Sequence, residues 1–232
     1  MITRFHCASS LLGGVVLAFI LALPVSGSVI FSDNFNSGAS PLWGNQSGNW
    51  IASGGVYFAQ SPTNSPLTHS LLPFVVDDFV VDVDVNGASD GGIWLRSNMD
   101  RTKGVLLVVA GLGHSGTGLY WHIGPDFITV LNPSADLFNQ GDNIHVQVVV
   151  LGDTYSAYLN GSSNPATTLV TSSVPNGLVG LYDFTGHTFG QQDFDNFALS
   201  TEAPPVPEPS PAVLIIAGLA SLFAAMRINL SH

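Results

Sequence analysis

The sequence predicts an all-β fold, an antiparallel β-sandwich, for the middle of this 232-residue chain. Between residues 29 and 199, apolar residues alternate with polar ones or form short blocks, and no stretch keeps helical spacing over three turns. Turn signals rich in Gly, Asn, Asp and Pro separate these blocks. The chain contains 25 glycines, which is typical of many tight turns between short strands.

Thirteen segments have the length and composition of strands. In chain order they are 29–35, 55–60, 68–75, 78–85, 92–97, 104–110, 118–123, 127–131, 144–151, 154–159, 167–172, 178–184 and 193–199. The turn sequences between them include "ASGG", "NGASDGG", "GHSGTG" and "NQGDN". So many short strands in one stretch predict a single two-sheet domain over residues 28–201.

Two stretches predict particular elements: the first a strand with one apolar and one polar face, and the second a β-hairpin. "FVVDVDV" at 79–85 alternates, so that its apolar side chains share one face while Asp82 and Asp84 share the other. "VQVVVLGDTYSAYLNG" at 146–161 predicts two antiparallel strands joined by the two-residue turn Gly152-Asp153. Both patterns are typical of an antiparallel sheet with one buried face.

These strands, with "FSDNF" at 31–35 and "DFDNFAL" at 193–199, resemble jelly-roll domains of the concanavalin A-like lectin/glucanase class, which are related to laminin G-like modules. The resemblance implies that the first and last strands pair side by side in one sheet. A smaller immunoglobulin-like sandwich is the alternative, but it has seven to nine strands and the sequence offers thirteen.

Residues 1–27 have the pattern of a secretory signal peptide with an apolar signal helix. Arg4 precedes the apolar run "LLGGVVLAFILAL", and Val25 and Gly27 supply small residues for a cleavage site. A buried N-terminal helix or an uncleaved anchor is the alternative. The single cysteine, Cys7, lies in this segment, so the mature chain would lack disulfides, cysteine metal sites and a cysteine nucleophile.

The C-terminal end combines a Pro-rich linker, residues 202–211, with a short hydrophobic helix and tail, residues 212–232. As a helix, the apolar stretch 212–226 would measure roughly 22 Å, whereas the core of a bilayer is ~30 Å thick. The sequence therefore predicts a marginal membrane span behind an extended linker.

Pro207, Glu208 and Pro209, the apolar helix and Arg227 together resemble the PEP-CTERM sorting tail of Gram-negative bacteria. The resemblance implies a transient inner-membrane anchor, processing by an exosortase, and a final place at the cell surface or outside the cell. Bacteria with such tails typically make an exopolysaccharide. Family tails usually end in a cluster of Arg or Lys, whereas here Arg227 stands alone; a plain C-terminal anchor is the alternative.

The charge of the predicted mature domain is strongly negative. Between residues 28 and 203, three Lys and Arg residues stand against fifteen Asp and Glu residues. Such a surface repels nucleic acid and anionic lipid, so we expect no nucleic-acid partner.

Three pairs of side chains share strand faces and are candidates for a glycan site. If these faces meet on one concave sheet, aromatic rings would stack on a sugar while planar polar groups bind its hydroxyls. The candidates are Asp82, Asp84, Trp94, Arg96, Tyr120 and His122. The sequence therefore favours a surface or matrix protein that binds exopolysaccharide or another glycan. The alternative is packing, with Arg96 paired to Asp82 or Asp84 across strands.

Composition disfavours catalysis. Retaining glycosidases use two carboxylates, which are Glu residues in jelly-roll glucanases, but residues 28–200 contain no Glu. A glycan hydrolase that uses Asp82 and Asp84 as acid and base is one alternative. A purely structural surface module is another.

Acidic residues at the two ends of the domain suggest calcium as the one candidate cofactor. Asp33 lies on the first predicted strand, and Asp193 and Asp195 lie on the last. Hard oxygen ligands brought together by the pairing of these strands would suit Ca²⁺. The alternative is that these side chains bind turn backbone.

Overall fold

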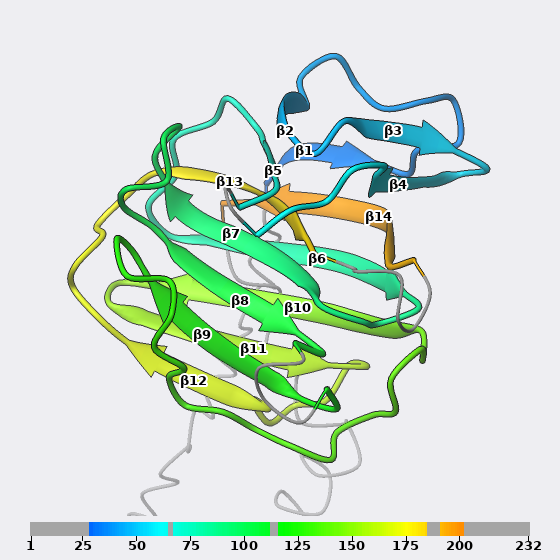
Figure 1. The fold of residues 1–232 in the computed structure, drawn as a ribbon. Coiled ribbons are helices and arrows are strands. Elements are labelled where there is room, and N and C mark those ends of the chain that lie inside the picture. Colours follow the sequence, from blue (N-terminus) through cyan, green and yellow to red (C-terminus); the bar gives the residue numbers. More distant parts are fainter. Residues whose placement is uncertain (1–27, 65–66, 112–115, 185–190, 202–232) are drawn as a thin grey trace, which may run out of the picture.

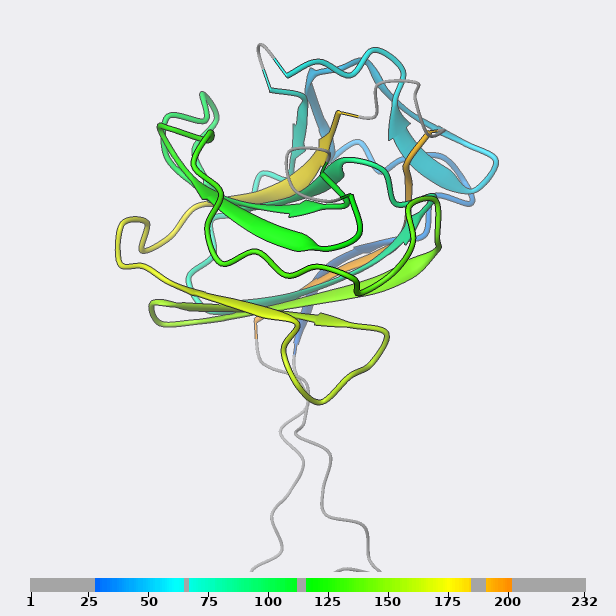
Figure 2. The same ribbon diagram turned by 60° about the horizontal axis from the view of Figure 1, so that its bottom comes forward.

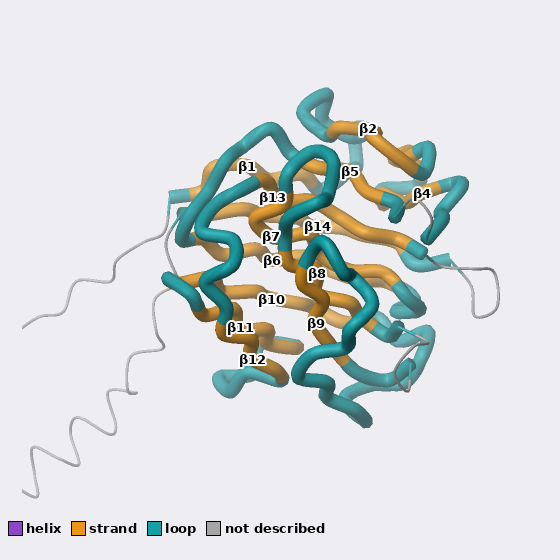
Figure 3. Tube along the Cα trace, turned by 60° about the vertical axis from the view of Figure 1, so that its left-hand side comes forward, coloured by secondary structure: helices purple, strands orange, loops and turns teal. Residues whose placement is uncertain are grey.

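The computed structural model describes residues 28–64, 67–111, 116–184 and 191–201. These residues form fourteen strands, and loops connect them without a helix (Figure 3). The expected signal peptide, the linker with Pro207, Glu208 and Pro209, and the tail with Arg227 lie outside the described residues. Within the described ranges, no helix has the length and apolar character needed to cross a membrane.

The strands pack as two antiparallel sheets, one above the other (Figures 1 and 2). The eight-stranded sheet has the order β12 (Thr167–Val170), β11 (Thr154–Leu159), β10 (Ile144–Leu151), β6 (Phe79–Asn86), β14 (Asp193–Ser200), β4 (Val56–Ala59) and β3 (Trp50–Ser53), and β1 (Val29–Asp33) also pairs with β14. The six-stranded sheet has the order β2 (Gly44–Ser47), β5 (His69–Leu71), β13 (Leu178–Asp183), β7 (Gly91–Ser97), β8 (Val105–Val109) and β9 (Leu119–Ile123). The predicted all-β sandwich is confirmed.

The main core lies between the two sheets and follows the alternation of the sequence. On β6, Val81, Val83 and Val85 are fully buried against the opposite sheet, whereas Asp82 and Asp84 point outward. Because each strand has a period of two, the same alternation on the six-stranded sheet leaves a second set of side chains on its outer face.

The first and last strands pair as the resemblance implied. β1 and β14 are antiparallel, with Asp33 opposite Phe197, and the Thr201 N–H donates to the Ser28 carbonyl at 3.1 Å. The two ends of the described domain therefore lie side by side, on paired strands of the eight-stranded sheet.

Local turn chemistry accounts for both the correct and the missed strands. The β10–β11 hairpin closes at Leu151 and Thr154, with Gly152 at φ +54, as predicted. The sequence pattern does not predict β2, because that strand is short and polar. It also does not predict β3, although the Gly54-Gly55 turn joins β3 to β4 in a hairpin and a hairpin needs a strand on both sides. Residues 127–131 are not a strand of either sheet and make only an isolated bridge, from Leu131 to Trp121.

Candidate functional site

A cavity of about 380 Å³ lies on the outer face of the six-stranded sheet. Its floor comes from β8, β9 and β13, and one wall is the loop after β9. The described lining residues are Asn64, Leu67, Asp90, Leu106, Val108, Tyr120, His122, Phe127, Ile128, Val130, Tyr182 and Phe184. Most of this lining is aromatic or aliphatic, and a few polar groups converge on it.

Tyr120 and His122 share the cavity floor, as the sequence predicted. Their neighbours on β9 point into the main core, so the alternation of the strand turns this pair outward. The two rings meet edge to face at 5.2 Å, and the His122 Nδ1 lies 2.8 Å from the Thr129 carbonyl. Burial lowers the pKa of His122, so its imidazole is neutral at neutral pH.

Trp94 lies on the same outer face but is completely buried. Its ring meets the edge of Phe127 at 5.0 Å, and its Nε1 donates to the Thr68 carbonyl at 3.4 Å. Trp94 is not among the lining residues, so its role is to support the wall that Phe127 forms, not to stack on a ligand.

Asp90 is a cavity residue that the sequence reasoning missed. It lies in the turn before β7 and is only 8% exposed. Burial raises the pKa of Tyr120 and of Tyr182, and the Asp90 carboxylate raises both further, so both hydroxyls stay protonated. The available signal was a lone carboxylate in "NGASDGG", directly before the two glycines that open the next strand.

Asn64 adds a second polar group that was missed. It is exposed on the loop before β5 and accepts a hydrogen bond from the Tyr182 hydroxyl at 3.4 Å. Nothing in its sequence neighbourhood distinguishes it from an ordinary loop residue, and only the folded loop brings it to the cavity.

The structure does not bring Asp82 and Asp84 to this cavity. The expectation of one shared groove is wrong, because β6 belongs to the eight-stranded sheet and its polar face points away from the other sheet. His145 lies between the two carboxylates, with Nδ1 2.7 Å from Asp84 Oδ1 and Nε2 3.3 Å from Asp82 Oδ1. Gln147 donates to Asp82 at 2.9 Å and Asn196 donates to Asp84 at 2.8 Å.

Asp82, Asp84 and His145 form an acid–histidine patch that is partly exposed, and its side chains bind one another by hydrogen bonds and ion pairs. The hydrogen bonds of Asp82 and Asp84 raise the pKa of His145 to about 9. The pair expected to serve as acid and base is therefore tied to a histidine on the opposite face of the sandwich from the cavity.

Arg96 does not share the face of Trp94, and that prediction is wrong. The pairing of β7 with β13 shifts register near Arg96, whose φ is +48, so the alternation of the strand breaks there. The side chain turns inward and is 2% exposed. Its partner carboxylate is Asp78, at 3.4 Å, and not Asp82 or Asp84.

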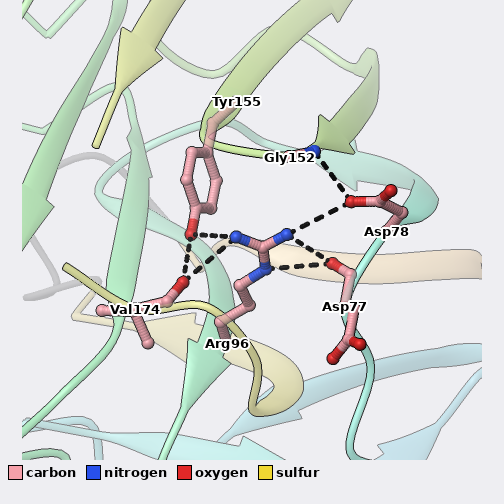
Figure 4. A network of polar contacts seen from close by, with 6 residues as sticks. All are labelled: Asp77, Asp78, Arg96, Gly152, Tyr155 and Val174. Atoms are coloured by element: carbon pink, nitrogen blue, oxygen red, sulfur yellow. Dashed lines mark hydrogen bonds and ion pairs between the residues drawn. The ribbon is translucent and has the colours of Figure 1, made fainter. Parts of the chain in front are cut away.

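The guanidinium of Arg96 binds main-chain carbonyls, as Figure 4 shows. Its Nε and Nη2 donate to the Asp77 carbonyl at 2.9 and 2.7 Å. Its Nη1 donates to the Val174 carbonyl at 3.1 Å and to the Tyr155 hydroxyl at 3.2 Å. Arg96 therefore has a structural role, because its hydrogen bonds connect the loop that contains Asp77 to the loop that contains Val174.

The candidate calcium ligands do not form a cluster. Asp33 accepts hydrogen bonds from the Phe35 and Ser40 N–H groups and from Trp43 Nε1, so it shapes the loop after β1. Asp195 accepts a hydrogen bond from the Asn196 N–H. In the part of the chain that the structure describes, no group of three or more His, Cys, Asp or Glu is placed to hold a metal ion. Calcium binding remains a prediction.

Comparisons with known proteins identify the fold. No model of a known protein family matches this chain, and no curated protein matches it. The carbohydrate-binding module CBM66 from Bacillus subtilis is similar, with a TM-score of 0.57 and 17% identity over 68% of this chain and 95% of that chain. The fold is a galectin-like, concanavalin A-like β-sandwich.

Two further solved structures agree with this assignment. The exoplasmic/lumenal domain of VIP36, in its Ca²⁺/Man3GlcNAc-bound form, has a TM-score of 0.55 and 11% identity over 78% of this chain and 91% of that chain. A Bacillus subtilis protein of unknown function with a galectin-like fold has a TM-score of 0.52 and 8% identity over 77% of this chain and 98% of that chain. At such identities the likeness establishes the fold alone.

Proposed function

We propose that this chain is a glycan-binding protein that holds its sugar in the cavity on the outer face of the six-stranded sheet. The observation that carries this proposal is the composition of the cavity. Tyr120 and Tyr182 lie in its floor with 5% and 3% of their surface exposed, and the half-buried Phe127 lies in its wall, while Asp90 and Asn64 supply acceptors that can bind hydroxyl groups. Apolar lining with a few convergent polar groups is what small-molecule sites have, and the volume lies within their usual range of roughly 300–1,000 Å³.

The solved structures of similar fold support the same ligand class. One is described as a carbohydrate-binding module, and another was determined with Man3GlcNAc bound. The position of Ile128 adds independent support, because this rim residue is 83% exposed. An aliphatic side chain so exposed beside an aromatic cavity offers contact surface to a ligand.

We also propose that the protein is exported and processed by an exosortase, with the inner membrane as a transient anchor, and acts at the cell surface or in the extracellular matrix on exopolysaccharide. The support is the sequence pattern at the two ends, with Pro207, Glu208, Pro209 and Arg227 as the sorting signal. The two ends of the described domain lie side by side on the paired strands β1 and β14, which is compatible with a leader and a tail that share one side of the domain. The cavity lies over the other sheet.

The experiment is a glycan array probed with the full chain, including Man3GlcNAc and neutral β-glucan oligosaccharides, followed by calorimetry on the ligands that bind. We expect binding that Tyr120→Ala weakens at least about tenfold, since the substitution removes the ring that forms the cavity floor, and thermal unfolding of the variant checks that it is folded. Ile128→Ser should weaken it by a smaller factor.

Val170→Ser is the matched control, because Val170 is also a largely exposed aliphatic residue but lies on β12 of the other sheet. Loss of affinity in this control equal to that of Ile128→Ser would refute the assignment of the cavity. An array with no bound glycan would refute the function and favour a purely structural module.

A further inference from the structure

The surface that the glycan cavity offers to a ligand is mostly apolar. Among the described residues, seven of the twelve that line it have no polar atom in the side chain. Two of the seven are almost completely buried in the floor, and the other five keep exposed surface: Leu67, Phe127, Ile128, Val130 and Phe184. A ligand that enters the cavity therefore meets aliphatic and phenyl groups over much of its own surface.

The polar side chains of the lining are few and already have partners in the chain. The Tyr182 hydroxyl donates to Asn64 Oδ1 at 3.4 Å, and neither Asp90 nor Tyr120 is without a partner. Because an amide oxygen has two lone pairs, Asn64 can still accept a hydrogen bond from one sugar hydroxyl. A hydroxyl that meets the apolar part of the lining instead loses its water and gains no partner.

His122 provides one more acceptor. Its Nδ1 lies 2.8 Å from the Thr129 carbonyl, and a carbonyl can only accept, so Nδ1 carries the proton and Nε2 is an acceptor. Burial lowers the pKa of His122, which keeps the ring neutral. The cavity can therefore accept hydrogen bonds from a sugar at a few points, while the rest of its surface suits apolar groups.

The apolar wall is held in place before a ligand enters. Leu131 and Trp121 exchange main-chain hydrogen bonds of 2.9 and 3.0 Å, which tie one end of the wall to β9. At the other end, the Phe127 ring packs edge to face on the buried Trp94 at 5.0 Å. Ile128 lies between these two attachments and is 83% exposed. A wall fixed in this way offers a preformed apolar surface.

We propose that the cavity binds glycans through a methyl group of the sugar, that this group is the C6 methyl of a 6-deoxyhexose, and that Val130 contributes to its contact surface. This proposal rests on the proposed function of the cavity. A 6-deoxyhexose has a methyl group where the parent hexose has CH2OH, and its ring hydroxyls remain to donate to Asn64 and His122. The methyl group gains by leaving water, whereas the C6 hydroxyl of the parent would lose its hydration against the apolar lining. Sites of this kind separate ligands that differ by one such group by about tenfold or more.

The test is calorimetry on the full chain with two pairs of sugars, L-fucose with L-galactose and L-rhamnose with L-mannose. The members of each pair differ only in the group at C6. We expect the 6-deoxy sugar to bind at least about tenfold more tightly in one of the pairs. Val130→Thr should bring that ratio to within about threefold, because Thr has the shape of Val and adds a hydroxyl that can bind the C6 hydroxyl.

Val149→Thr is the matched control. It makes the same change at another half-buried valine, which lies on the outer face of the other sheet, on β10. We expect its ratio to equal that of the wild-type chain, and the proposal is overturned if Val149→Thr narrows the ratio as much as Val130→Thr does. Should Val130→Thr not fold, as thermal unfolding would show, the exposed Ile128→Thr takes its place, and an unchanged ratio in that variant overturns the proposal.

The remaining outcomes separate this proposal from the proposed function. Equal affinities within both pairs, or array glycans that bind while neither 6-deoxy sugar does, overturn the methyl contact and leave glycan binding intact. A third pair, N-acetylglucosamine and glucose, tests the other common source of a methyl group. A preference for N-acetylglucosamine without any preference in the first two pairs overturns the 6-deoxyhexose class, whereas the absence of any bound glycan overturns the function itself.

Discussion

Replacing Arg96 by Met should destabilise the sandwich strongly, although Arg96 is not among the residues that line the proposed glycan cavity. The guanidinium is 2% exposed and makes four hydrogen bonds of 3.2 Å or less to the Asp77 carbonyl, the Val174 carbonyl and the Tyr155 hydroxyl (Figure 4). Its carbon atom Cζ also lies 5.3 Å from the Tyr155 ring centroid. Methionine fills much of the same space and keeps the positive φ, so the substitution mainly removes the polar contacts.

The magnitude follows from the groups left behind. The Val174 carbonyl keeps the hydrogen bond from the Tyr155 hydroxyl at 3.1 Å, whereas the Asp77 carbonyl loses both of the bonds that Arg96 supplies. Asp77 is exposed, so water can reach its surroundings, and the cost comes mainly from the two lost hydrogen bonds, since hydrogen bonds from a charged donor are worth about 1.5–3 kcal/mol each. We expect Arg96→Met to lower the free energy of unfolding by about 3–5 kcal/mol, a large share of the 5–15 kcal/mol that is typical of folded domains.

Urea denaturation followed by tryptophan fluorescence measures this change. With a slope of about 2 kcal/mol per molar urea, the midpoint should fall by about 1.5–2.5 M. Asp78→Asn is the matched control, because Asp78 is half exposed and Asn keeps an acceptor for the Gly152 N–H, so its ion pair should be worth at most about 1 kcal/mol. The reasoning is refuted if Arg96→Met costs less than about 1 kcal/mol, or if Asp78→Asn costs as much.

Two predictions concern pH. The pKa of His145 is raised from 6.5 to about 9, so its stabilising contribution is fully present below pH 6.5 and lost as pH rises through 9. His145→Gln should remove this pH dependence from the free energy of unfolding. The prediction is contradicted if the free energy of unfolding of the variant changes with pH as that of the wild type does. Burial, and then the charge of Asp183, raises the pKa of Asp193 from 3.8 to about 6, so ionisation of Asp193 should destabilise the chain as pH rises through 6. Asp193→Asn should therefore be more stable than wild type at pH 7.5 and equal to it at pH 3.5. A less stable variant at pH 7.5, with calcium-dependent unfolding of the wild type, would contradict this and support the calcium prediction.

Those parts of the fold that depend on local pattern could be predicted from the sequence. The alternation within "FVVDVDV" and "GLYWHIG" correctly turned Asp82 and Asp84 to one face of β6 and Tyr120 and His122 to one face of β9. The sheet to which each strand belongs depends instead on pairing over long sequence distances, for example of β6 with β10 and β14. Alternation therefore paired Asp82 with Asp84 and Tyr120 with His122 correctly, but it could not show that the first pair lies on the other sheet, away from the cavity.

Arg96 and Asp90 were misjudged for a different reason. Both have positive φ, at +48 and +103, and both are fixed by main-chain groups that are distant in sequence. Period-two reasoning assumes an undisturbed strand, so the register shift beside Arg96 reverses its direction. Asp90 belongs to a turn, where the sequence pattern predicts reversal of the chain and says nothing of where a side chain points.

The loop after β9 shows how a failed prediction can mark a site. "FITVL" at 127–131 has the aromatic and β-branched composition of a strand, yet it pairs only through Leu131 and lies along the cavity. Phe127 and Val130 are half buried against the apolar side chains on the outer face of the six-stranded sheet, which include Trp94 and Tyr182, while Ile128 remains 83% exposed. These apolar residues neither fill the core between the sheets nor take part in strand pairing, apart from Leu131. Lining a ligand cavity would explain why they are apolar. Replacing these residues by polar ones should therefore affect glycan affinity before it affects the stability of either sheet.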